Sequence, residues 1–402
     1  MRTKEIKSAC KRVKAFVNTS RPTLPILACV KIESNGSSLA MTAYNMEVGV
    51  GIVVKLPDAS AGTFATCVKF ADLEKIIGKL KSDSLELSAS ERTETTCDRV
   101  YNAESGRRES VSETEKVIDL TVRSAGLSFT LNGRPASDFP ILPGPSGDTL
   151  ALTACQYGRL AGELAFVLKA TNHDTPRNFT SGVLFDFRPE TVILVGTDGR
   201  RLHEAKISGP HTQDSESPIK SFLPPVMALD SLLKLNLDPA DMIELSFYEA
   251  LLCWKAPDAG VSGVIHLLDT PYPDYEKVIP EMTNVFRLDS KGTVQALDAL
   301  SIIAHEHDGR DMVVINANGR LNLSVKSETV GKAVADLPLT HVQGGAETLV
   351  ALNIDYLTDI LKACESPDGS MTMSNADPLE PCRFDYPDSD RIAVLMPVRL
   401  PE

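Results

Sequence analysis

Candidate catalytic and metal-binding motifs occur in the sequence only as fragments. The Gly-Lys pairs at 78–79 and 331–332 are followed by Leu and Ala instead of the Ser or Thr of a phosphate-binding loop. The Gly-Val-Ser-Gly at 260–263 lacks the second spacer of a hydrolase nucleophile elbow. His305 and His307 are two residues apart, so on a helix they would point in different directions rather than share a metal ion. We therefore expect no enzyme activity, no metal site and no cofactor.

A row of cations near the N-terminus is a better candidate for a binding function. The first 20 residues hold six Lys or Arg and one acid, whereas the remaining residues sum to −18 and bring the chain to −13. Apolar residues at helical spacing predict an amphipathic helix here, namely Ile6, Ala9, Cys10, Val13, Phe16 and Val17. Its opposite side carries Lys4, Lys7, Lys11 and Lys14. An ordinary solvated face is one interpretation, and a polyanion partner is the other.

Composition is that of a globular protein and sets the broad class. The chain has 402 residues, 43% apolar and 24% charged, which predicts about two to four domains. No stretch approaches the roughly 18 apolar residues of a membrane span, and the N-terminal residues contain no apolar run typical of a secretory signal. The eight cysteines form no Cys-x-x-Cys pair, so we expect free, buried thiols.

The same order of helices and strands is predicted three times along the chain, and these repeated elements must position any functional residue. Strand–turn–strand segments with a polar centre are expected at 38–49, 192–202 and 321–331. Each is followed by a short amphipathic helix, at 70–80, 225–235 and 354–363, and then by alternating strands, at 85–89, 243–247 and 371–374. Each unit also opens with a helix, which we expect in the N-terminal residues, over 151–170 and over 292–305. The predicted class is α+β, with three repeated domains that each contain two helices and antiparallel sheets.

The first unit contains an insertion. The equivalent positions Thr42, Thr197 and Ser324 are 155 and 127 residues apart, so the first unit is longer by 28 residues. Residues 90–117 are rich in Ser, Thr, Glu and Arg and have almost no large apolar side chains. We therefore expect a mobile loop at this point, dispensable for the fold, whose role the sequence does not indicate.

Five strings, in order along the chain, carry a family resemblance. They are Ser-Arg-Pro-Thr-Leu-Pro-Ile-Leu-Ala at 20–28, Ala-Ser-Asp-Phe-Pro-Ile-Leu-Pro at 136–143, Gly-Thr-Asp-Gly-Arg-Arg-Leu at 196–202, Tyr-Pro-Asp-Tyr-Glu-Lys-Val-Ile-Pro at 272–280 and Leu-Met-Pro-Val-Arg-Leu at 395–400. Together they resemble the bacterial DNA polymerase III beta subunit, the sliding clamp. The resemblance covers essentially the whole chain.

The resemblance implies a function as well as a fold. It implies a head-to-tail homodimeric ring of six domains that encircles double-stranded DNA without sequence specificity, as a non-catalytic processivity factor. Its domains would be 1–146, 147–282 and 283–402. Implied partners are a second copy, the replicative polymerase alpha subunit, the clamp loader and other clamp-binding-motif proteins. The implied location is cytoplasmic and nucleoid-associated, with no membrane contact.

The resemblance also assigns residues. DNA contacts would come from Lys4, Lys7, Lys11, Lys14, Arg21 and Arg177. A groove for partner peptides of a Gln-x-x-Leu-Phe-like pattern would contain Thr180, Thr197, Gly199, Arg200, Arg201, Leu202, Pro273, Val278, Val394, Leu395, Met396 and Pro397. The subunit junction would contain Phe129, Ile302 and Ile303.

Three positions depart from the family pattern. Thr180 stands where some members carry Leu, and Ala299 where members often carry Arg, while Pro225-Val226 lacks the basic residues often found there. DNA-facing charge is therefore expected mainly in the first domain. A repeat scaffold that binds only proteins remains the alternative. Such a scaffold would show no dependence on DNA topology.

Overall fold

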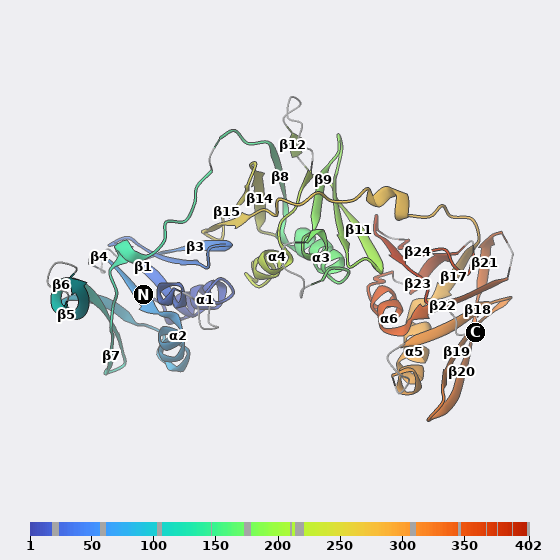
Figure 1. Cartoon of the computed structure of the whole chain (residues 1–402), viewed down its shortest axis with the longest axis horizontal. Helices are drawn as coiled ribbons and strands as arrows, with labels where there is room; N and C mark the ends of the chain where they lie inside the picture. Colours follow the sequence, from blue (N-terminus) through green and yellow to red (C-terminus); the bar gives the residue numbers. More distant parts are fainter. Residues whose placement is uncertain are drawn as a thin grey trace. The chain divides into compact units, whose positions relative to one another are not determined.

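The computed structural model describes residues 1–17, 24–56, 62–102, 107–145, 147–172, 178–209, 211–213, 221–305, 311–344, 347–366, 368–375, 377–387 and 389–399. Within these ranges the fold is α+β, as predicted. The helices are α1 (Thr3–Lys14), α2 (Phe70–Lys79), α3 (Tyr157–Leu168), α4 (Val226–Leu233), α5 (Ser290–Ala304) and α6 (Ile354–Lys362) (Figure 1). A helix is therefore present in each expected region, although the one expected over 151–170 is shorter than predicted.

The strands fall into three groups, one in each repeat. The first repeat contains β1 (Cys29–Asn35), β2 (Ser38–Tyr44), β3 (Val48–Lys55), β4 (Thr63–Lys69), β5 (Glu86–Asn102), β6 (Arg107–Ser124) and β7 (Leu127–Leu131). The second contains β8 (Ala151–Gln156), β9 (Leu184–Phe187), β10 (Val192–Thr197), β11 (Arg201–Ile207), β12 (His211–Gln213), β13 (Ser221–Phe222), β14 (Met242–Phe247), β15 (Leu251–Ala256) and β16 (Val261–His266). The third contains β17 (Val285–Asp289), β18 (Met312–Ala317), β19 (Arg320–Ser327), β20 (Gly331–Pro338), β21 (Thr340–Gln343), β22 (Thr348–Asn353), β23 (Ser370–Ser374), β24 (Cys382–Asp385) and β25 (Ile392–Leu395).

The chain forms two compact units, and both contain part of the middle repeat. The first unit comprises Met1–Gly158 and Ala228–His266, and the second comprises Arg159–Met227 and Leu267–Glu402. In the first unit a sheet runs in the order β8-β14-β15-β16-β3-β2-β1-β4, beside a smaller sheet β5-β6-β7. In the second, one sheet runs β13-β9-β10-β11-β25-β24-β23-β17-β21 and another β20-β19-β18-β22.

Sheets therefore continue from one repeat into the next. The first repeat joins the second where β3 pairs antiparallel with β16, in a register that sets Ile52 opposite Val261. The second joins the third where β11 pairs with β25, with Leu202 opposite Val394. This sharing explains why the two compact units do not coincide with three repeats. The domain boundaries at 146 and 282 stay a prediction.

Helix α1 packs as its apolar periodicity predicts. Ile6, Val13 and Phe16 are almost fully buried, and each such side chain contributes about 1.5–3 kcal/mol when it leaves water. The Phe16 ring lies 6.2 Å from that of Trp254, the only tryptophan in the sequence. The Ser231 hydroxyl of α4 donates a hydrogen bond to the carbonyl oxygen of Ala15, 3.0 Å away. One face of α1 is thus fixed in the core, and its lysine face is left outside.

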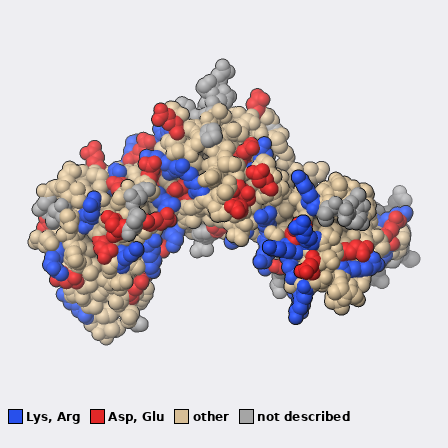
Figure 2. Space-filling model, turned by 180° about the vertical axis from the view of Figure 1, so that it is seen from behind, with Lys and Arg blue, Asp and Glu red and all other residues tan. Residues whose placement is uncertain are grey.

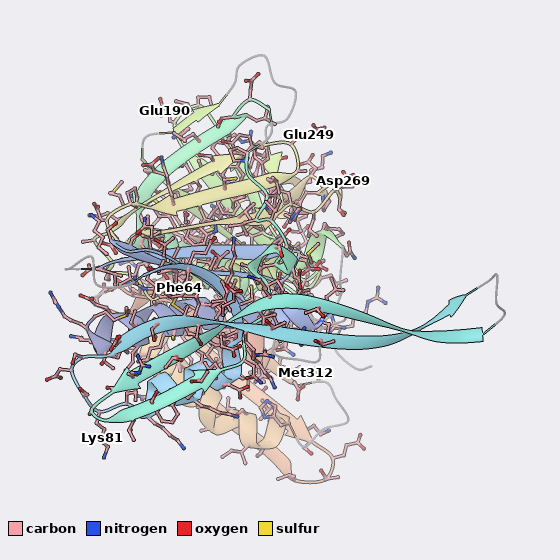
Figure 3. All side chains as sticks on the ribbon, turned by 90° about the vertical axis from the view of Figure 1, so that its left-hand side faces the viewer. Phe64, Lys81, Glu190, Glu249, Asp269 and Met312 are labelled. Carbon is pink, nitrogen blue, oxygen red and sulfur yellow. The ribbon has the colours of Figure 1, made fainter. Side chains whose placement is uncertain are left out.

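The expected loop at 90–117 is wrong, because this segment forms most of a β-hairpin. Strands β5 and β6 pair without a register shift from Glu86 opposite Arg123 to Asn102 opposite Arg107, and Figure 3 shows the two ribbons extending well beyond β7. Cross-strand polar pairs replace apolar contacts: Lys116 forms an ion pair with Glu91 at 2.6 Å and Arg92 one with Asp119 at 2.9 Å, and the Thr95 and Thr114 hydroxyls lie 3.5 Å apart. Such pairs stabilise strands without apolar alternation.

The helix expected over 151–170 is also partly wrong. Residues Ala151–Gln156 form strand β8, which pairs with β14, and α3 begins only at Tyr157. Side chains in β8 alternate between buried and half-buried positions, which is the period of a strand. Its small residues Ala151, Ala154 and Cys155 do not distinguish the two structures by composition.

Candidate functional site

An apolar cavity of about 170 Å³ lies in the second unit. It is formed by the turn between β10 and β11, the chain just after β25, and the short helix η4 (Tyr275–Val278). Its lining comprises Phe179, Thr197, Gly199, Arg200, Arg201, Leu202, Tyr272, Pro273, Tyr275, Val278, Val394 and Met396. We call this cavity the groove.

The turn that forms one wall of the groove is built by its own side chains. The Thr197 hydroxyl donates to the carbonyl oxygen of Arg201 at 2.7 Å and accepts from the amide of Gly199 at 3.1 Å. One Asp198 carboxylate oxygen accepts from the amides of Arg200 and Arg201 at 2.9 and 3.0 Å. Gly199 has a φ of 84°, a backbone conformation that favours glycine. The Thr-Asp-Gly-Arg-Arg string therefore specifies a tight turn.

Strand pairing brings the other wall to this turn. Because β11 pairs with β25, Arg201 lies opposite Leu395, and the amide of Met396 donates to the carbonyl oxygen of Arg200 at 2.9 Å. The groove floor is a buried cluster to which Leu202, Tyr275 and Val394 belong. Residues nearly 200 positions apart in the sequence thus lie around one cavity.

Three lining residues were missing from the sequence-based set. Phe179 and Tyr272 pack edge to face with centroids 5.7 Å apart, and the Tyr275 hydroxyl donates to Asp186 at 3.0 Å. Burial raises the pKa values of both tyrosines, so their hydroxyls remain protonated donors at neutral pH. Both lie inside the Tyr-Pro-Asp-Tyr string at 272–275, which was a signal for them.

The structure brings together most, but not all, of the expected groove residues. Thr180 is buried beside Phe179 and does not line the cavity. Leu395 is buried, and neither it nor Pro397 belongs to the lining. Exposed apolar surface remains at Val278 and Met396, where a ligand could cover it.

The cationic face of α1 lies in the first unit. Lys4, Lys11 and Lys14 are exposed, and Lys7 is half-buried with its ammonium 2.6 Å from the carbonyl oxygen of Leu80. Lys14 forms an ion pair with Glu74 of α2 at 2.8 Å, so the row is not free of carboxylates. Figure 2 shows Lys and Arg gathered over α1 and α2.

A hollow of about 820 Å³ lies between the start of α1 and the end of α2. The cations that line it are Arg2, Lys4, Lys7, Lys79 and Lys81, with Asp83 as the only acid in the lining. A surface of this kind attracts polyanions. Two other expected DNA contacts, Arg21 and Arg177, lie outside the described residues.

Of the expected junction residues, one lies on an edge strand and two lie on a helix that packs beside another edge strand. Phe129 is on β7 and is 36% exposed, next to the still more exposed Leu127. Ile302 on α5 is 71% exposed and Ile303 is half-buried, on the helix that packs against β19 and β20. Among the described residues, β7 and β20 each pair with one strand only. Exposed apolar residues at an unpaired edge favour association.

Other expectations concern metal ions, membranes and thiols. In the part of the chain that the structure describes, no cluster of His, Cys, Asp and Glu could hold a metal ion, while His307 lies outside it. No helix in these ranges is long and apolar enough to cross a membrane. The described cysteines are free thiols, and burial raises the pKa of Cys10 and Cys382 to about 12. Such thiols are unreactive at neutral pH.

Comparison with known proteins gives a consistent set of relatives. A family model for the DNA polymerase III beta subunit, C-terminal domain, matches residues 276–399. The beta sliding clamp of Staphylococcus epidermidis is 22% identical over 94% of this chain and 93% of its own length. Among solved structures, the sliding clamp of Pseudomonas aeruginosa bound to griselimycin is similar with a TM-score of 0.83 at 19% identity, covering 100% of this chain and 98% of that one. The DNA polymerase III beta subunit of Thermotoga maritima has a TM-score of 0.81 at 20% identity, covering 100% and 99%.

Proposed function

We propose that this chain belongs to the beta sliding clamp family of bacterial DNA polymerase III and that it is a DNA polymerase processivity factor. Two copies close head to tail into a ring around duplex DNA. The ring tethers the replicative polymerase alpha subunit, and it also serves the clamp loader and other clamp-binding-motif proteins. It acts in the cytoplasm at the nucleoid and catalyses no reaction itself.

The observation that carries this proposal is the way sheets join between repeats. Strand β3 of the first repeat pairs with β16, the last strand of the second, and β11 of the second pairs with β25, the last strand of the third. By its order in the repeat, β20 corresponds to β3 and β11, whereas β7 corresponds to β16 and β25. A third joint of the same kind would pair β20 of one copy with β7 of another.

Such a joint closes when two copies supply it to each other. In a two-fold arrangement each copy gives one β7 edge and one β20 edge, so two identical junctions form. Exposed apolar side chains are available on both sides: Phe129 and Leu127 at β7, Ile302 and Val334 at α5 and β20. Their burial in the junctions would drive association.

The lysines of α1 and the apolar groove would give the ring its two binding activities, for DNA and for partner peptides. The exposed lysines of α1 suit the phosphates of duplex DNA, and contact with phosphates alone carries no sequence information. The apolar groove suits an extended peptide that inserts two apolar side chains. A partner held at the groove stays near the template because the ring cannot leave closed DNA, which is an effective-concentration effect.

Retention on DNA of different topology tests the proposal. Wild-type protein at micromolar concentration is incubated with linear DNA whose cohesive ends are then joined into a nicked circle, so that threaded rings are trapped, and gel filtration is run before and after the circle is cut again. We expect a dimer that stays on circles and is lost from linear DNA. Equal retention on both forms would exclude encirclement, and no dependence on DNA at all would indicate a scaffold that binds only proteins.

A matched pair of variants tests the junction. Changing Ile302 to Asp places a charge in each proposed junction, so we expect a monomer at sub-micromolar concentration by sedimentation and no retention on circles. Leu379 is equally exposed at 69% but lies in the turn before β24, so Leu379→Asp should remain a dimer. A dimeric Ile302→Asp protein would contradict the assigned junction.

A further inference from the structure

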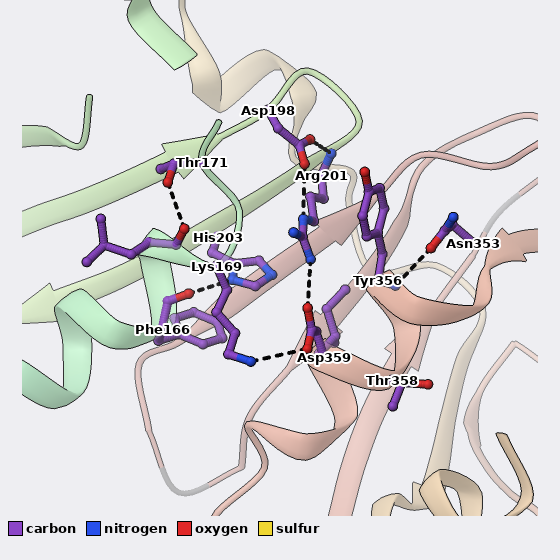
Figure 4. A network of polar contacts seen from close by, with 12 residues as sticks. Phe166, Lys169, Thr171, Asp198, Arg201, His203, Asn353, Tyr356, Thr358 and Asp359 are labelled. Atoms are coloured by element: carbon purple, nitrogen blue, oxygen red, sulfur yellow. Dashed lines mark hydrogen bonds and ion pairs between the residues drawn. The ribbon is translucent and has the colours of Figure 1, made fainter. Parts of the chain in front are cut away.

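The guanidinium group of Arg201 is held by a helix of the third repeat. Its Nε donates to Asp198 at 3.1 Å, within the turn, and its Nη1 donates to Asp359 of α6 at 3.2 Å. The Tyr356 ring lies below it, with the ring centroid 4.0 Å from Cζ. Figure 4 shows Arg201 between Asp198, Asp359 and Tyr356. Two carboxylates and one aromatic face therefore fix a single side chain of the groove wall.

The two residues of α6 are themselves well positioned. The Asn353 side chain caps the helix and accepts from the amide of Tyr356 at 2.9 Å. The other oxygen of Asp359 lies 3.1 Å from the ammonium of Lys169, just after α3. Asp359 thus contacts two cations of the second repeat. The net charge of Asp359, Arg201, Lys169 and Asp198 together is zero. Only 11% of the Arg201 side chain is exposed, so these contacts are little screened by solvent.

We propose that Asp359 and Tyr356 are positioning residues for partner binding, because they hold the Arg201 side chain in the conformation that forms the groove wall. This inference rests on the proposed peptide-binding role of the groove. It deepens that role by making one wall depend on α6, which contributes no residue to the groove lining.

The physical basis is the rotamer freedom of arginine. Without Asp359 the guanidinium keeps one carboxylate partner, Asp198, and its long side chain gains conformations that no longer line the groove. A peptide must then pay for ordering that side chain, so its affinity falls even though none of its contacts is removed. Because the change acts through Arg201, it must vanish when Arg201 itself is absent.

The experiment is a fluorescence-anisotropy titration of a labelled peptide of the Gln-x-x-Leu-Phe pattern, with alanine at the variable positions. Asp359→Asn is compared with Asp355→Asn, the same change one turn earlier on α6, where the carboxylate is exposed and bonds His305 at 3.1 Å. We expect about fivefold or greater weakening for Asp359→Asn and less than about twofold for Asp355→Asn. Tyr356→Phe should bind as wild type and Tyr356→Leu more weakly.

A double-mutant cycle separates positioning from general damage to the fold. In an Arg201→Met background, Asp359→Asn should change affinity by less than about twofold. Equal weakening with and without Arg201, or unchanged affinity of the single variant, would overturn the inference. Met396→Asp is the control for the site, since a charge in the groove should abolish binding. If wild type binds and Met396→Asp does not, the groove assignment stands whatever Asp359→Asn does, whereas a wild type that does not bind refutes both.

Discussion

The buried imidazole of His203 should make the stability of the second unit depend on pH. The ring is fully buried, with Nδ1 2.8 Å from the carbonyl oxygen of Phe166, and it stacks on the Phe166 ring with centroids 4.4 Å apart. Burial lowers the pKa of His203 from its ordinary value of 6.5 to about 4, against the opposing effect of the carbonyl and with help from Arg201 and Lys169. At neutral pH the ring is therefore uncharged and donates from Nδ1.

The sign and size of the effect follow from proton uptake. Below pH 6.5 the unfolded chain binds a proton on this ring, whereas the folded chain binds it only near pH 4. The contribution of His203 to stability is thus complete above pH 6.5 and is lost as the pH falls toward 4. At about 1.36 kcal/mol per pKa unit, the loss is about 2 kcal/mol at pH 5 and approaches about 3.4 kcal/mol below pH 4.

Urea unfolding of wild type and His203→Gln at pH 7.5 and pH 5.0 measures this. Glutamine can still donate to the Phe166 carbonyl but does not titrate. Burial raises the pKa of Glu204, but this group titrates in both proteins, so its effect cancels in the difference between them. By far-UV circular dichroism, we expect wild type to lose about 2 kcal/mol more than the variant on acidification. The fluorescence of Trp254, which lies in the first unit, should shift equally in both. Equal losses by circular dichroism would refute a neutral, buried His203.

Two further predictions concern the first unit. Changing Lys4 and Lys11 to Glu should weaken retention on nicked circles and make the slope of log affinity against log salt concentration shallower by about two or more. Lys255 is an exposed cation on β15, and Lys255→Glu should have no effect. Unchanged retention of the α1 variant would contradict a phosphate contact there. Deleting residues 94–115 and closing the hairpin with Asn-Gly should leave the midpoint of thermal unfolding unchanged. Deleting residues 90–117 also removes the buried Val117 and Arg92, which pairs with Asp119, so it should lower the midpoint. Equal midpoints for the two deletions would show that the hairpin base adds nothing to the core.

The sequence predicted elements best where apolar spacing decides the structure. The face of α1 containing Ile6 and Val13 follows from periodicity alone, because a helix with that face unburied would expose it to water. The hairpin of β5 and β6 was missed because its strands are held by cross-strand pairs such as Arg92–Asp119. Those pairs exist only after the register is set, and composition does not reveal the register.

The groove was predictable only through the resemblance, and only in part. The string at 196–202 indicates a turn, but nothing local places Met396 beside it, because the link is the pairing of β11 with β25. Tyr272 and Tyr275 lay within a recognised string and were still omitted, since the string does not say which side chains face the cavity. The contact between Arg201 and Asp359 joins positions 158 apart, and no periodicity connects them.

The shared sheets have a mechanical consequence for the proposed ring. Between repeats of one chain, a hydrogen-bonded strand ladder acts together with an unbroken backbone, so a load applied across such a joint is carried by covalent bonds even after the ladder parts. Between two copies only the ladder and its apolar contacts resist. In the proposed ring, the two joints of β7 with β20 are therefore the ones that can open without a load on the covalent backbone, so opening requires only non-covalent contacts at one of them to be broken.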